Sequence, residues 1–179
     1  MRLGNRPDSF GVVTKSIHWL TVLAVMAAAA LGIWIEEMEV SLATIRYFGW
    51  HKTVGITVLA LTLLRIAWHF WSPVPPVLPA SAVAERLARA VHLALYGCLV
   101  AMPLTGWIGS SATGLDTIVF GKVTLPAIAP VSATIEDLAF DIHETLAVLL
   151  GLLVALHVAG ALNRAIVHRD GTLKRMLGG

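Results

Sequence analysis

The chain has 179 residues, of which 57% are hydrophobic and 13% charged, and its mean hydropathy is +0.79. Soluble domains are about 45–50% apolar, so this composition indicates a membrane protein and excludes a large water-soluble catalytic domain. The net charge of +2 gives no basis for a nucleic-acid partner, and a single cysteine excludes an intrachain disulfide and a covalently attached c-type haem.

Four apolar stretches follow one another along the chain, each near the ~20 residues that cross a bilayer as a helix. The predicted spans are residues 16–36, 51–71, 86–109 and 141–167. Acidic residues follow the first span, prolines follow the second, and a Gly- and Pro-containing loop follows the third. In that loop Thr134 begins a capping-box-like pattern, which predicts a short interfacial helix before the fourth span. We therefore expect one all-α domain over residues 1–179, a four-helix transmembrane bundle surrounded by membrane lipid.

Lysine and arginine are unequally divided between the two sides of these spans. The outer side holds Arg46, Lys52 and Lys122 together with most of the acidic residues. The other side holds the remaining cations, which are Arg2, Arg6, Lys15, Arg65, Arg86, Arg89, Arg164, Arg169, Lys174 and Arg175. Positive residues stay on the cytoplasmic side of a membrane, so both termini are expected in the cytoplasm and the loop after the third span outside, in a multi-pass membrane protein.

Histidines lie in or at the edges of the spans, where ionisable side chains are costly and commonly functional. His143 and His157 are fourteen residues apart, which on a helix is ~21 Å along the axis and only about 40° from the same face. Because successive helices run in opposite directions, His51 and His143 should both lie near the outer surface. His18 and His157 should both lie toward the inner one.

Two facing histidine pairs in a bundle are what two bis-histidine b haems require, each iron taking one imidazole from each of two helices. Arg65, fourteen residues after His51, should lie beside the inner pair, where it could bind a haem propionate. His92 lies at nearly the same depth as His157 and could replace His18 as a ligand, bind a propionate, line a quinone pocket or be structural. The rival interpretation of these histidines is a proton pathway or a metal-transport pathway.

The motifs that contain these residues resemble a known family. They are Ser16-Ile17-His18-Trp19-Leu20, His51 with Gly55, Leu64-Arg65, Pro73-x-Pro75-Pro76, His92-Leu93-x-x-Tyr96, Pro103-x-x-Gly106 and His143-Glu144-Thr145-Leu146-Ala147. The sequence resembles the bacterial cytochromes b561 of the inner membrane over essentially its whole length. The resemblance implies a four-helix bundle enclosing two b haems, with His51 and His143 on the outer haem iron and His18 and His157 on the inner one.

By the same resemblance, the activity expected is that of the family's superoxide oxidases, which oxidise superoxide to dioxygen on the periplasmic side and reduce ubiquinone. Arg46, Lys52 and Lys122 could then form a positive funnel for superoxide near the outer haem, or simply be scattered interfacial cations. The quinone could bind near the inner pair, with His92 or Arg164 as donors, or near the outer pair. The alternative function is an electron relay that passes electrons from a partner dehydrogenase or carrier to quinone.

Overall fold

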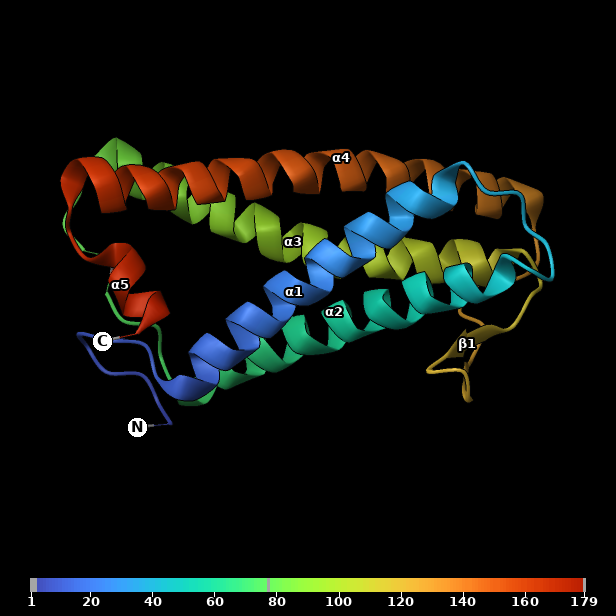
Figure 1. Ribbon diagram of the computed structural model, residues 1–179, viewed down its shortest axis with the longest axis horizontal. Coiled ribbons are helices and arrows are strands. Elements are labelled where there is room, and N and C mark those ends of the chain that lie inside the picture. Colours follow the sequence, from blue (N-terminus) through green and yellow to red (C-terminus); the bar gives the residue numbers. More distant parts are fainter. Residues whose placement is uncertain (1–2, 77, 179) are drawn as a thin grey trace.

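The computed structural model describes residues 3–76 and 78–178, and within these residues four long helices run the length of the molecule (Figure 1). The helices are α1 (Val12–Glu36), α2 (Ile45–Trp71), α3 (Ala82–Ala112) and α4 (Ala133–Asn163). A short π-helix, η1 (Arg164–His168), continues α4, and the helix α5 (Thr172–Leu177) folds back beside it. All four long helices are apolar enough to cross a membrane. The all-α, four-helix architecture predicted from the sequence is thereby confirmed.

The helices pack as two neighbouring pairs. The most extensive contacts are those of α1 with α2 and of α3 with α4, whereas the two pairs touch chiefly through α2 and α3. Many large apolar side chains point outward, such as Leu23 and Leu152, which are 66% and 65% exposed. In a bilayer such side chains face lipid, since a spanning helix needs no polar outer face.

The loop between α3 and α4 contains a small antiparallel hairpin that the sequence did not predict. Strand β1 (Thr117–Val119) pairs with β2 (Val123–Leu125). Its turn contains Phe120 and Gly121, both with positive φ (53° and 64°), a conformation suited to a tight hairpin turn. The hairpin packs on the end of α2 that the charges predict to be outer, named the outer end below, where the Phe120 backbone N–H donates to Thr53 Oγ1 over 2.9 Å.

The helix expected near Thr134 is present, but not as a separate interfacial helix. It forms the first turns of α4, which runs without interruption from Ala133 to Asn163. The N-cap is Ser132, whose hydroxyl accepts from the backbone N–H of Ile135, so Thr134 already lies inside the helix. An effective cap satisfies the first free N–H groups, and the apolar pattern that follows lets the helix continue into the span.

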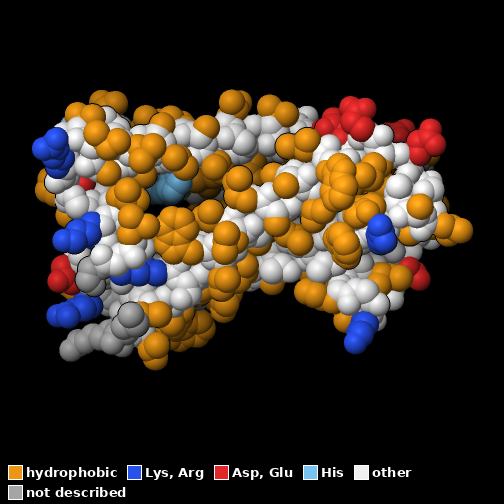
Figure 2. All heavy atoms as spheres, in the orientation of Figure 1, with side chains coloured by type: hydrophobic (Ala, Val, Ile, Leu, Met, Phe, Trp, Pro, Cys, Tyr) orange, Lys and Arg blue, Asp and Glu red, His pale blue; other side chains and the backbone are white. Residues whose placement is uncertain are grey.

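Charge divides the two ends of the bundle. Figure 2 shows Asp and Glu side chains gathered mainly over one end, and most Lys and Arg side chains over the end where both termini lie in Figure 1. Arg2, one of the cations counted for that end, lies outside the described residues. Positive side chains thus lie mainly at one end of the bundle and negative side chains mainly at the other. The predicted orientation depends on this division of charge.

Candidate functional site between the helix pairs

At the outer end, His51 of α2 faces His143 of α4 across the two helix pairs. Their ring centroids are 6.0 Å apart. His51 Nδ1 lies 3.1 Å from the carbonyl oxygen of Ala28 on α1, and His143 Nδ1 lies 2.9 Å from that of Met102 on α3. The His51 ring of α2 is therefore held by α1, and the His143 ring of α4 is held by α3. Because a carbonyl only accepts, Nδ1 carries the hydrogen in both rings, which leaves Nε2 as the nitrogen able to bind a metal.

A glycine lies beneath each of these two rings, four residues after the carbonyl that the ring contacts. A Cβ added at Gly32 would lie 3.2 Å from His51 Cε1, and one added at Gly106 would lie 3.1 Å from His143 Cε1. Both distances are tighter than ordinary van der Waals contact, so a larger residue would displace the ring. The two outer histidines thus dock in the same way, each on a carbonyl and a glycine one helical turn further along.

Replacing Gly106 by alanine should disturb the outer histidine pair specifically. The new methyl group overlaps the His143 ring, and overpacking of this kind costs roughly 1–3 kcal/mol. A haem bound by His51 and His143 should be retained less well in Gly106→Ala, measured as haem lost during detergent exchange. Gly97→Ala on the same helix is the matched control, because a Cβ there meets nothing within 4 Å. Equal haem retention in both variants would contradict this role for Gly106.

At the inner end, all four helices contribute to a second group of polar side chains. His157 of α4 has its ring centroid 6.4 Å from that of His18 on α1 and 5.1 Å from that of His92 on α3. Arg65 of α2 donates from Nη1 to His18 Nδ1 over 3.0 Å. His157 therefore has two imidazole neighbours, and both roles considered for His92, ligand and neighbour of the ligand, fit its position.

Arg65 is half-buried between the helices and has more donors than partners. Its guanidinium lies 5.7 Å from the ring centroid of Tyr96, and its Nε is buried without a hydrogen-bond partner among the described residues. A buried unpaired donor is costly. A propionate beside His18 would supply the missing acceptor, as expected for Arg65 from the sequence.

These features fit the axial ligands of haem. A metal–imidazole bond is about 2 Å long, so rings whose centroids lie 6.0 Å apart can share one ion between them. The outer pair has the tautomer that ligation by Nε2 requires. At the inner level Arg65 donates to His18 Nδ1, so ligation by His18 Nε2 would require Arg65 to turn to another acceptor, such as a carboxylate. A Cβ added at Gly55 or at Gly151 would meet nothing within 4 Å. The close approaches occur instead at Gly32 and Gly106.

The three outer cations differ in their surroundings. The hairpin that carries Lys122 is fixed to α2 at Thr53, the residue after Lys52, so these two lysines lie on elements in contact. Arg46 instead turns to its neighbour, donating to the Tyr47 hydroxyl over 2.7 Å with its guanidinium 4.7 Å from that ring centroid. Lys122 and Arg46 are exposed and Lys52 is half-buried.

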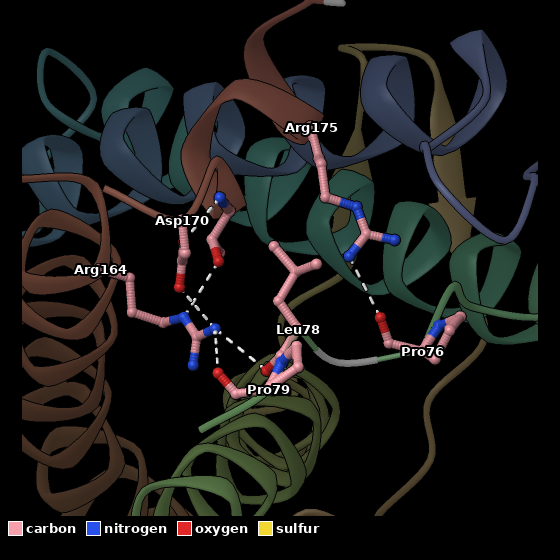
Figure 3. A network of polar contacts seen from close by, with 7 residues as sticks. Pro76, Leu78, Pro79, Arg164, Asp170 and Arg175 are labelled. Carbon is pink, nitrogen blue, oxygen red and sulfur yellow. Dashed lines mark hydrogen bonds and ion pairs between the residues drawn. The ribbon is translucent and has the colours of Figure 1, made fainter. Parts of the chain in front are cut away.

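The inner end is closed by a network around Arg164, just after α4 (Figure 3). Arg164 forms an ion pair with Asp170 and donates to Thr172 Oγ1 and to the carbonyl oxygen of Leu78, both over 3.0 Å. Arg175 reaches the carbonyl oxygen of Pro76 over 3.1 Å. The network joins the C-terminal segment to the loop between α2 and α3. Because its donors are engaged here, Arg164 is a structural residue in this arrangement.

Asp170 should be needed for this closure at neutral pH. Burial raises the pKa of Asp170, but hydrogen bonds from Thr172 and the charge of Arg164 outweigh that effect and hold the pKa below its ordinary value. The carboxylate therefore stabilises the folded end above about pH 4, and the contribution is lost as the pH falls through the lowered pKa. We expect faster tryptic cleavage at Lys174 in Asp170→Asn, with Asp8→Asn as control; equal rates would contradict this role.

The sequence of this chain is similar to those of several known proteins. Residues 9–179 match the family model described as prokaryotic cytochrome b561. The chain is 35% identical to "Cytochrome b561 homolog 2" of Escherichia coli K12, over 99% of this chain and 96% of that protein. It is 30% identical to "Probable superoxide oxidase CybB" of Yersinia pestis, over 90% and 91% of the two chains, and 31% identical to "Cytochrome b561 homolog 1" of Escherichia coli K12, over 90% and 92%.

Proposed function

Because this chain belongs to the prokaryotic cytochrome b561 family, and is therefore a multi-pass membrane electron carrier that uses haem b, we propose that it oxidises superoxide to dioxygen and reduces ubiquinone. The family membership rests on a match over residues 9–179. The choice of superoxide as donor is supported by the 30% identity to the relative named "Probable superoxide oxidase CybB".

The two histidine levels are the observation that carries the proposal. We assign His51 and His143 to one haem, near the outer surface, and His18 and His157 to the other, with Arg65 as the partner of a propionate. These residues would hold haem b, which would supply one-electron transfer, and two imidazole ligands on each iron would leave dioxygen no free site. The residues that orient the outer ligands are Ala28 and Met102 through their carbonyl oxygens and Gly32 and Gly106 through their lack of a side chain.

The outer end also offers a reason for superoxide to approach there. Superoxide is an anion, and positive side chains near a reaction site raise the rate of encounter with an anion. Lys52 follows the proposed outer ligand His51 directly, and Lys122 lies on the hairpin fixed to the residue after Lys52. We assign these two lysines to guiding superoxide. Arg46 is a weaker candidate for guiding superoxide, because its guanidinium already stacks on the Tyr47 ring.

Stopped-flow mixing of the oxidised, detergent-purified protein with superoxide tests donor and acceptor together. We expect rapid growth of the reduced b-haem α band, and its decay when ubiquinone is added. A protein that contains haem but does not respond to superoxide would contradict the superoxide proposal and favour the relay fed by a partner dehydrogenase or carrier. A purified protein without haem would contradict the proposed ligands and favour a proton pathway.

A further inference from the structure

A groove lies at the inner end of the bundle, between η1 and α5, away from both histidine levels. Its volume is about 360 Å³, and it is lined by Ala165, Arg169, Gly171, Leu173, Lys174 and Leu177. Most of this lining is apolar, and both polar side chains in it are cations. A groove of this composition suits a ligand with an apolar body and a negative head.

The two cations of the groove are not neutralised by the protein. Arg169 and Lys174 are both exposed, and neither takes part in an ion pair among residues 3–76 and 78–178. The adjacent carboxylate, Asp170, is bound to Arg164 instead. Among the described residues, the Arg169 side chain makes one long hydrogen bond, 3.4 Å from its Nε to the carbonyl oxygen of Ile166. The charge of the groove is therefore available to an anion.

The backbone holds this groove in a defined shape. Arg169 has φ 51° and Gly171 has φ 83°, and these two left-handed residues turn the chain back so that α5 lies beside η1. Left-handed φ is unfavourable for a residue with a Cβ, so the turn at Arg169 is kept by its surroundings. Trp19 contributes to those surroundings by donating from Nε1 to the carbonyl oxygen of Met176 over 3.2 Å.

The groove lies beside an apolar surface that continues from a spanning helix, which indicates the kind of anion that binds there. η1 directly continues the spanning helix α4, and its Ile166 and Val167 are 65% and 67% exposed, so an apolar surface reaches to the edge of the groove. A membrane protein's apolar surface is covered by lipid. Basic pockets at this depth attract the headgroups of anionic lipids.

We propose that the groove between η1 and α5 binds an anionic phospholipid, with Arg169 and Lys174 on the headgroup phosphate and Leu173 and Leu177 against the acyl chains. The site is separate from the electron-transfer site and does not depend on the proposed donor or acceptor. It needs only that the groove lie at the membrane surface, which holds for either orientation of the bundle.

Native mass spectrometry of the full-length holoprotein tests the proposal. The protein is released from detergent after incubation with equal amounts of phosphatidylglycerol and phosphatidylcholine carrying the same acyl chains. We expect the wild type to retain phosphatidylglycerol preferentially. Because each cation near a lipid headgroup contributes to binding, the Arg169→Asn, Lys174→Gln double variant should retain at least about tenfold less of it. Asparagine tolerates the left-handed backbone at position 169, so the fold should persist.

The matched control is Lys15→Gln with Arg86→Gln, which removes the same charge from the same end but outside the groove, and it should retain phosphatidylglycerol as the wild type does. Lys174→Gln alone, at an exposed position, should show a partial loss. Equal retention of the two lipids by the wild type, undiminished retention in the double variant, or displacement of the lipid by millimolar inorganic phosphate would each overturn the proposal.

Discussion

Replacing either outer histidine should remove one haem and leave the other. In His51→Ala and in His143→Ala, the iron of the outer haem loses one of its two imidazoles, and the remaining ring stays docked on its own helix pair. The inner ligands are ~21 Å away along the helix axis, so their haem should stay bound. The haem content, measured as the pyridine haemochrome per polypeptide, should fall to about half that of the wild type.

His168→Ala is the control for these variants, because His168 is exposed at the end of η1 and belongs to neither histidine level. It should keep the full haem content. Full retention in both His51→Ala and His143→Ala would show that these rings are not ligands. Loss of all haem from both, with the protein still monodisperse, would show that the two levels do not bind independently.

Neutralising the two outer lysines should slow superoxide-driven haem reduction. In the Lys52→Gln, Lys122→Gln double variant the outer end loses two positive charges and keeps its acidic residues, so the local potential becomes less attractive to an anion. Electrostatic guidance changes association rates by roughly 10–10³-fold, and we expect a rate about tenfold lower at low ionic strength. The measurement is the second-order rate of haem reduction in stopped flow.

The salt dependence of that rate separates guidance from damage to the site. Added salt screens exposed charges, so the wild-type rate should fall with ionic strength and the double variant's rate should change little. Lys15→Gln with Arg86→Gln removes the same charge from the opposite end and should leave both rate and salt dependence as in the wild type. A double variant of Lys52 and Lys122 with an unchanged rate would refute the guiding role.

The helices could be predicted from the sequence because a membrane-spanning helix is recognisable from its composition alone. Long uncharged runs need no tertiary information to be recognised, since every backbone group of a spanning helix is satisfied within it. The structure extends the first predicted span at its start, from residue 16 to Val12, and the third at both ends, to Ala82 and Ala112. The extension at the start of α3 is capped by Ser81, whose hydroxyl accepts from the backbone N–H of Ala84.

The pairing of the histidines by depth also followed from the sequence, because rise per residue and alternating direction place each one along the bundle. The structure brings together the rings so paired, His51 with His143 and His18 with His157. The structure also places His92 beside His157. The sequence put these two histidines at nearly the same depth, but depth alone could not show that their rings are neighbours. The neighbour of His18 is Arg65, which the spacing placed at the inner level.

What the sequence could not predict were contacts that depend on how neighbouring helices are rotated. The docking of His51 on Ala28 and Gly32, and of His143 on Met102 and Gly106, requires the exact facing of two helices. A glycine opposite a histidine is a usable signal only once the helix pairs are known. The hairpin could not be predicted for another reason. Strands of three residues such as β1 are too short for an alternation of apolar and polar residues to be recognised.

We propose that four histidines on two levels hold two b haems. Electron paramagnetic resonance of the oxidised wild-type protein, combined with its haem-to-polypeptide ratio, tests this claim most directly. We expect a ratio of two and low-spin signals from both haems, because each iron would have two imidazole ligands. A ratio of one, or a high-spin signal from a haem with an open axial position, would contradict it.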